Sequence, residues 1–211
     1  MKWTELLEIV GREPVFSASL LQAGDTDRKE LSVQLSRWLR AGRLVQLRRG
    51  VYAIARPYRH AEPHPFRVAN ALRKNSYVSL QSALAFHGVI PEYVPVCTSV
   101  TTARTERLET ELGTYTYHHV KPDYLFGFDQ REVAANQHAF VATPEKALLD
   151  LVYITPRGND ASYLRELRLQ HTELVDMTKL EELANRMDKP KLRSAARVIR
   201  LIFDEETVRS L

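Results

Sequence analysis

The chain has 211 residues, of which 44% are hydrophobic and 27% charged, and its formal net charge is +4. These proportions are ordinary for a globular protein, so they exclude wholesale disorder, a collagen-like repeat and a coiled coil. A single cysteine cannot form an internal disulfide, and no apolar stretch approaches the ~18 residues of a membrane span, so we expect a cytoplasmic protein without a membrane segment.

Three helices are predicted in the first 42 residues. The apolar residues between Trp3 and Val10 recur at helical spacing and predict a first helix. Ser17 has a side chain typical of helix N-caps, which predicts a short second helix over residues 17–23. Asp27 and Glu30 stand at capping-box spacing and Gly42 is a typical residue after a helix end, so a third helix is expected between them.

The outward face of the third helix is expected to be basic and hydroxylated. At 100° per residue, Leu31, Leu35 and Trp38 gather on one side. The other side and its flank carry Lys29, Ser32, Val33, Ser36, Arg37 and Arg40. Such cations can reach phosphates and guanine edges in a DNA major groove. We expect Arg37 to read a base, and Arg40, nearer the end of the helix, to contact a phosphate.

Two β-prone runs, 43–47 and 51–54, flank Arg48-Arg49-Gly50 and predict a hairpin with a basic tip. Residues 31–61 contain seven arginines and no acid, and this charge favours DNA over a purely protein-binding role. Three helices followed by a hairpin is the order of a winged helix-turn-helix. The sequence therefore predicts a DNA-binding domain of this kind over residues 1–56.

The rest of the chain is predicted as a linker followed by a second domain. Residues 57–65 hold three prolines and form the linker, and residues 66–211 form a mixed α/β domain that ends in helices. The predicted fold class is thus α+β. Expected elements are helices over 66–74 and 79–87, with Ser79 as a cap, strands over 96–102, 113–120 and 138–142, and a buried helix capped by Thr143.

The C-terminal part is predicted to be helical. Thr178 and Glu181 stand at capping-box spacing, and Pro190 begins a helix that reaches about Phe203. Along one side of that helix lie Arg193, Arg197 and Arg200, a candidate second basic site for a nucleic acid or an acidic partner. The alternative is a solvated face paired with Glu181 and Glu182, which is the usual fate of charged helix faces.

Catalytic chemistry has little support in the sequence. The common phosphate-binding, dinucleotide-binding, metalloprotease and nucleophile-elbow motifs do not occur. The residue types that a metal-dependent nuclease uses, carboxylates and a lysine, occur without a defining motif at Asp123, Asp129, Glu145, Lys146 and Asp150. We therefore expect no enzyme, no cofactor and no metal site, with a nuclease kept as the less favoured alternative.

Several ordered segments carry a family resemblance: 44–52, 77–84, 88–92, 98–102 and 142–150. Over most of residues 3–170 the sequence resembles the AbiEi family, the antitoxins of type IV abortive-infection toxin–antitoxin systems. The resemblance implies an N-terminal winged helix that binds inverted repeats in its own promoter and represses it. It places the DNA contacts on the third helix and the wing, here Arg28, Lys29, Ser32, Ser36, Arg37, Arg40, Arg48 and Arg49.

The same resemblance implies that the C-terminal domain counteracts a nucleotidyltransferase toxin without forming a stable complex. We therefore expect a transcriptional repressor whose partners are double-stranded DNA and, functionally, a toxin, with oligomerisation on the repeats. The alternative is a module that does not bind DNA and binds a toxin directly, which co-purification with a neighbouring gene product would favour. Segment 142–150 is apolar enough to be a packing element, with Asp150 held by Lys146 one turn away.

Overall fold

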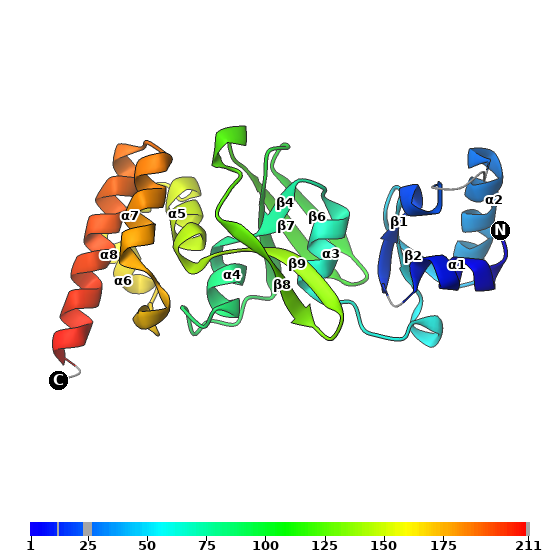
Figure 1. Cartoon of the computed structure of the whole chain (residues 1–211), viewed down its shortest axis with the longest axis horizontal. Helices are drawn as coiled ribbons and strands as arrows, with labels where there is room; N and C mark the ends of the chain where they lie inside the picture. Colours follow the sequence, from blue (N-terminus) through cyan, green and yellow to red (C-terminus); the bar gives the residue numbers. More distant parts are fainter. Residues whose placement is uncertain (12, 23–26, 210–211) are drawn as a thin grey trace.

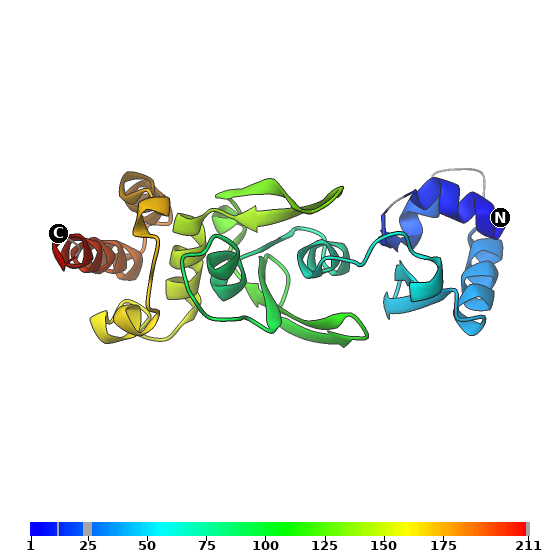
Figure 2. The same cartoon turned by 90° about the horizontal axis from the view of Figure 1, so that it is seen from below.

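The structure, a computed structural model, describes residues 1–11, 13–22 and 27–209. The molecule is elongated, with a helical and stranded N-terminal unit at one end, a six-stranded sheet in the middle, and C-terminal helices at the other end (Figures 1 and 2). The predicted α+β class, a winged helix-turn-helix followed by a mixed domain ending in helices, is confirmed.

The N-terminal unit has the element order of a winged helix. Its elements are α1 (Trp3–Val10), β1 (Val15–Ser17), the 3₁₀ helix η1 (Ala18–Gln22), α2 (Arg28–Arg40), β2 (Leu44–Arg48) and β3 (Val51–Ile54). The strands form an antiparallel sheet in the order β1-β3-β2. The predicted second helix is thus one 3₁₀ segment, and Ser17 ends a strand rather than capping a helix; Ala23 lies outside the described residues.

Both ends of α2 follow from the sequence. The Asp27 carboxylate accepts a hydrogen bond from the backbone N–H of Lys29 at 3.1 Å, so it satisfies a donor that the helix cannot. At the other end Gly42 adopts φ +65° and donates to the Leu39 carbonyl at 3.0 Å, while the Arg43 N–H reaches the Trp38 carbonyl at 2.9 Å. These two hydrogen bonds end the helix sharply.

The three-stranded sheet is covered on both faces. On one face Phe16, Leu44, Tyr52 and Ile54 pack with residues of α1 and α2 in the N-terminal core. On the other, the residues Val15, Leu47, Val51 and Ala53 belong to the same hydrophobic cluster as α3 and the six-stranded sheet. This second face of the three-stranded sheet therefore packs the N-terminal unit against the rest of the molecule.

The second unit is built on a mixed sheet in the order β6-β7-β5-β4-β9-β8. After η2 (Arg56–Tyr58), its elements are α3 (Pro65–Leu72), β4 (Ser76–Val78), α4 (Leu80–Phe86), β5 (Val96–Thr101), β6 (Glu106–Thr110), β7 (Gly113–His119), η3 (Pro122–Tyr124), β8 (Phe128–Ala134) and β9 (Gln137–Ala142). The predicted helices and strands of this region are present to within two residues at each end. Sequence patterns missed β4, β6 and β8, because they are short or mostly polar.

The last part of the chain is helical, as predicted. It comprises α5 (Pro144–Ile154), α6 (Ala161–Glu166), the 3₁₀ helix η4 (Thr172–Leu174), α7 (Met177–Arg186) and α8 (Pro190–Arg209). One predicted cap is wrong: the Asp176 carboxylate, not Thr178, caps α7, accepting from the Thr178 and Lys179 N–H groups at 2.9 and 3.1 Å. No helix within the described residues has the length and apolar character needed to cross a membrane.

Candidate nucleic-acid interface

Apolar and aromatic contacts anchor one side of helix α2. Leu31, Leu35 and Trp38 are buried in the N-terminal core. The Trp3 ring of α1 meets the Trp38 ring edge-on, with 5.4 Å between centroids, and the Arg43 guanidinium lies over Trp3 at 5.5 Å. These contacts fix the rotation of α2 about its axis and so decide which side chains face outward.

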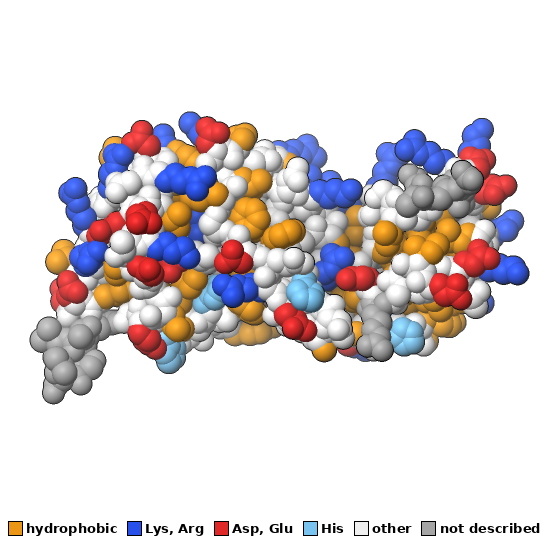
Figure 3. Space-filling view, viewed as in Figure 1, with side chains coloured by type: hydrophobic (Ala, Val, Ile, Leu, Met, Phe, Trp, Pro, Cys, Tyr) orange, Lys and Arg blue, Asp and Glu red, His pale blue; other side chains and the backbone are white. Residues whose placement is uncertain are grey.

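The outward face of α2 carries the residues predicted for it. Exposed on it are Arg28, Lys29, Ser32, Val33, Arg37 and Arg40, with Ser36 half-buried and Glu30 as an exposed acid in the first turn. Basic side chains gather around the outer end of the N-terminal unit, where α2 lies, interspersed with acidic ones (Figure 3). The excess of cations over acids on α2 itself suits a polyanion.

Short-range hydrogen bonds shape this face without neutralising it. The Ser36 hydroxyl donates to the Ser32 carbonyl at 2.9 Å, and Arg40 Nε donates to the Ser36 carbonyl at 3.4 Å. The Arg37 guanidinium reaches the Gln34 side-chain oxygen at 3.4 Å. Within the described residues, no ion pair of 4 Å or less involves the four cations of α2, so their charge remains for a ligand.

The two wing arginines differ in their surroundings. Arg49 is exposed at the hairpin tip. Arg48 instead turns to the second unit, where its Nη1 lies 3.2 Å from a carboxylate oxygen of Glu106 and 3.4 Å from the Leu72 carbonyl. Sequence reasoning could not anticipate this pairing, because Glu106 lies 58 residues further along the chain. In this conformation Arg49 is the wing cation that faces solvent.

The candidate second basic site lies at the opposite end of the molecule from α2, on α8 (Figure 1). Arg200 is paired with Glu181 at 2.8 Å, as the solvated-face alternative expects. Arg193 pairs with Asp188 and donates to the Asn185 side chain at 3.1 Å, while Arg197 is exposed. The three arginines therefore do not extend the basic face of α2, and two of them already have anionic partners.

Lys146 and Asp150, considered above for a nuclease, form a fully buried polar network. Their side chains make an ion pair with no exposed surface. Asp150 also accepts from the Tyr77 hydroxyl at 2.9 Å and from the Ser79 hydroxyl at 2.8 Å, and Lys146 Nζ donates to the Tyr77 oxygen at 2.8 Å. Ser79 thus stands at the start of α4 but gives its hydroxyl to Asp150 rather than capping the helix, contrary to prediction.

Burial and the ion pair act in opposite directions on this network. Burial lowers the pKa of Lys146, and the neighbouring Asp150 carboxylate partly restores it. Burial also raises the pKa of the Tyr77 hydroxyl, and Asp150 adds to that rise, so the hydroxyl stays a donor. Because solvent does not reach the Lys146 and Asp150 side chains, the arrangement is that of a structural cross-link between α5, β4 and the start of α4.

The other nuclease candidates are elsewhere. Glu145 is buried and accepts from the Asp176 N–H at 3.0 Å, with Lys179 Nζ at 3.3 Å, so it joins α5 to α7. Asp123 and Asp129 are exposed. Among the described residues, no three His, Cys, Asp or Glu side chains gather closely enough to hold a metal ion.

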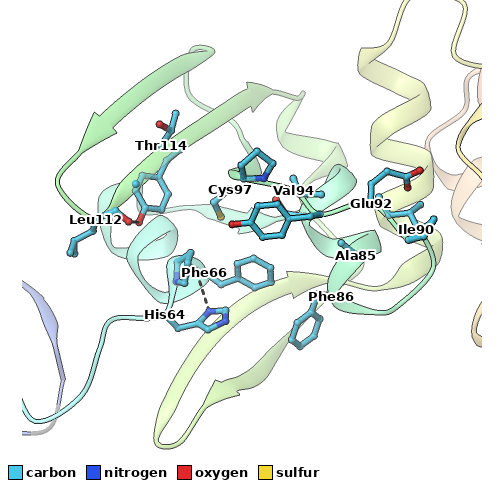
Figure 4. A pocket seen from close by; sticks show the side chains of 17 residues that line it. His64, Phe66, Ala85, Phe86, Ile90, Glu92, Val94, Cys97, Leu112 and Thr114 are labelled. Carbon is cyan, nitrogen blue, oxygen red and sulfur yellow. Dashed lines mark hydrogen bonds between the residues drawn. The ribbon is translucent and has the colours of Figure 1, made fainter.

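A pocket of about 540 Å³ opens on the second unit, between α3, α4 and the β5–β7 region (Figure 4). Its lining is mainly apolar and aromatic, including Phe66, Phe86 and Tyr93, with Glu92 as its carboxylate. No lysine or arginine is among the lining residues. This chemistry does not suit a phosphate backbone.

Comparison with known proteins agrees with the geometry of the N-terminal unit. Residues 7–55, which run from α1 through the wing, match the family described as "Transcriptional regulator, AbiEi antitoxin". The N-terminal unit is therefore similar to AbiEi antitoxin regulators. The AbiEi match ends with the wing, whereas the resemblance seen in the sequence extends into the second unit.

A solved structure shares the fold over most of the chain. The crystal structure of the RV2827C protein from Mycobacterium tuberculosis superposes with a TM-score of 0.53 and 15% sequence identity. The match covers 93% of this chain and 75% of that one, so the likeness includes the second unit as well as the winged helix. None of the curated proteins matches this sequence.

Proposed function

We propose that this protein is an AbiEi-family regulator that binds DNA, represses its own promoter and acts as a type IV antitoxin. The observation that carries the proposal is the outward face of α2. It presents Arg28, Lys29, Arg37 and Arg40 at the end of the molecule, and no ion pair of 4 Å or less neutralises them among the residues that the structure describes. A helix of this kind in a winged helix-turn-helix is the element that enters the major groove.

In the proposed complex the residues divide into base and backbone contacts. Arg37, an exposed residue in the last turn of α2, offers a forked guanidinium to a guanine edge. Arg40 at the end of α2 and Arg49 at the wing tip contact phosphates, and Lys29 and Ser32 contribute near the start of the helix. Because the promoter target is an inverted repeat, two or more copies assemble on it.

The antitoxin part of the proposal belongs to the second unit. That unit counteracts a nucleotidyltransferase toxin in the cytoplasm, without a stable complex and without a cofactor. Support comes from the family match together with the size of the second unit, which extends well beyond what a DNA-binding module needs. A stable complex with the toxin would instead favour the interaction-module alternative.

A promoter-reporter assay tests the regulatory part. The wild-type chain should repress a reporter driven by its own upstream DNA, and Arg37→Ala should relieve that repression. Arg197→Ala is the matched control, because Arg197 is an exposed helical arginine at the opposite end of the molecule. Equal repression by the wild type and Arg37→Ala would remove Arg37 from the proposed interface, and no repression by the wild type would refute autoregulation.

Growth rescue separates the two activities. Co-expression of the chain with the toxin of its operon should restore growth, and Arg37→Ala should restore it equally well when both are expressed from a foreign promoter. Rescue that depends on Arg37 would mean that antitoxin action operates only through DNA.

A further inference from the structure

One carboxylate joins the wing to the second unit. Glu106, the first residue of β6, lies 3.2 Å from Arg48 of the wing and also pairs with Arg73, which follows α3. The Glu106 side chain is 16% exposed and that of Arg48 is 31% exposed. The pair is therefore partly shielded from solvent and stronger than an ion pair at the open surface.

The junction holds more positive charge than Glu106 neutralises. Arg48 and Arg73 share the one carboxylate, and burial together with the nearby charges of Arg48 and Arg104 lowers the pKa of Arg73. The Nε of Arg73 is buried without a hydrogen-bond partner in the described structure. An additional anion at this junction would relieve repulsion among the guanidinium groups.

Arg48 can change partners without disturbing the hydrophobic contact between the two units. The contact is made by Leu47 and Val51, on either side of the wing tip, together with residues of β1 and β3. Arg48 itself is the last residue of β2, and its long side chain rests on the surface of the junction rather than in the core. A rotation of that side chain would bring its guanidinium from Glu106 to solvent.

We propose that Glu106 is a positioning residue of the DNA interface, which competes with a DNA phosphate for the guanidinium of Arg48. In the DNA-free protein the carboxylate holds Arg48 against the second unit, so Arg49 is the wing cation that first meets DNA. The second unit thereby withholds one phosphate contact, that of Arg48, and lowers the affinity of the protein for DNA. This inference rests on the proposed function, because it concerns the same interface.

A double-mutant cycle on DNA binding tests the competition. Glu106→Gln should raise affinity for duplex DNA by roughly five- to tenfold at low salt and steepen the dependence of log K on log salt concentration by about one. Arg48→Gln alone should change affinity little. The gain from Glu106→Gln should vanish when Arg48 is also Gln, because the released guanidinium is then absent.

Glu109→Gln is the matched control. It removes the same charge from the same strand, but Glu109 is 73% exposed and paired with Arg107. A gain in Glu109→Gln equal to that in Glu106→Gln, or a gain that persists without Arg48, would overturn the competition and leave only long-range repulsion of DNA. Glu106→Asp, which keeps the charge but withdraws the carboxylate by one methylene, should also raise affinity.

Unfolding of the DNA-free protein tests the contact independently of DNA. The Arg48 and Glu106 substitutions should couple by about threefold or more in the unfolding equilibrium constant, and additive effects would overturn the contact. If the wild type binds no DNA while the coupling is present, the proposed function fails, and with it the competition. If the wild type binds DNA and the coupling is missing, only the role of Glu106 fails.

Discussion

Removing the Asp150 carboxylate should destabilise the protein severely. Asp150 is fully buried and accepts from Tyr77 and Ser79 at 2.9 and 2.8 Å while it neutralises Lys146. Asp150→Asn would leave the Lys146 ammonium without its counter-charge in the core and would aim an amide N–H₂ at hydroxyl donors. Breaking a buried ion pair by removing one partner costs about 3–5 kcal/mol, which is a large part of the about 5–15 kcal/mol that stabilises a typical domain.

Equilibrium unfolding in urea, followed by circular dichroism, measures this effect. The double substitution Lys146→Met with Asp150→Leu should cost less than the sum of the two single substitutions, because no charge then remains in the core. Asp129→Asn is the control: Asp129 is exposed and pairs with Arg131 at 3.4 Å, so its loss should cost about 0.5 kcal/mol or less. An Asp150→Asn protein within about 1 kcal/mol of the wild type would refute the reasoning.

Three further predictions concern stability and charge. Gly127→Ala should destabilise the fold by more than about 1 kcal/mol, measured by the same unfolding assay, since Gly127 has φ +73° and an added Cβ would lie 2.9 Å from Lys146 Cγ; an unchanged midpoint would contradict this. Burial lowers the pKa of His64, His87 and His118 below 6.5, so below about pH 6.5 the unfolded chain binds more protons than the folded one and the free energy of unfolding falls as the pH falls. His87→Gln should make the free energy of unfolding depend less steeply on pH in this range, and an equally steep dependence in the variant would contradict the prediction. Replacing Arg193, Arg197 and Arg200 together by Ser should leave DNA affinity unchanged, and a clear loss in a binding titration would restore α8 as a second basic site.

Local signals predicted the elements that carry the candidate site. Asp27 caps the start of α2, and Gly42 marks its end. The spacing of the apolar residues in α2 predicts which side of the helix faces outward. The pairing of Lys146 with Asp150 follows from their i, i+4 spacing on a buried helix. These features depend on residues within a few positions of each other, and patterns in a single sequence can reveal such local relations.

Contacts between distant parts of the chain were beyond the sequence patterns. Nothing near Arg48 in the sequence indicates that its guanidinium pairs with Glu106. Ser79 has the sequence position of a helix cap, although its hydroxyl donates to Asp150, 71 residues away. The polar strand β8 has the composition of a loop and becomes a strand only by pairing with β9. Tertiary pairing therefore decided the details that local propensity left open.

Binding of the pure protein to its own upstream DNA and to a scrambled duplex, measured over a series of salt concentrations, tests the role of α2 most directly. We expect selective binding by the wild type, loss of selectivity in Arg37→Ala by about 1–3 kcal/mol, and a salt dependence in Arg49→Ala that is shallower by about one at retained selectivity. Equal, weak binding of both duplexes by the wild type, unchanged in either variant, would contradict a DNA-reading function for this helix.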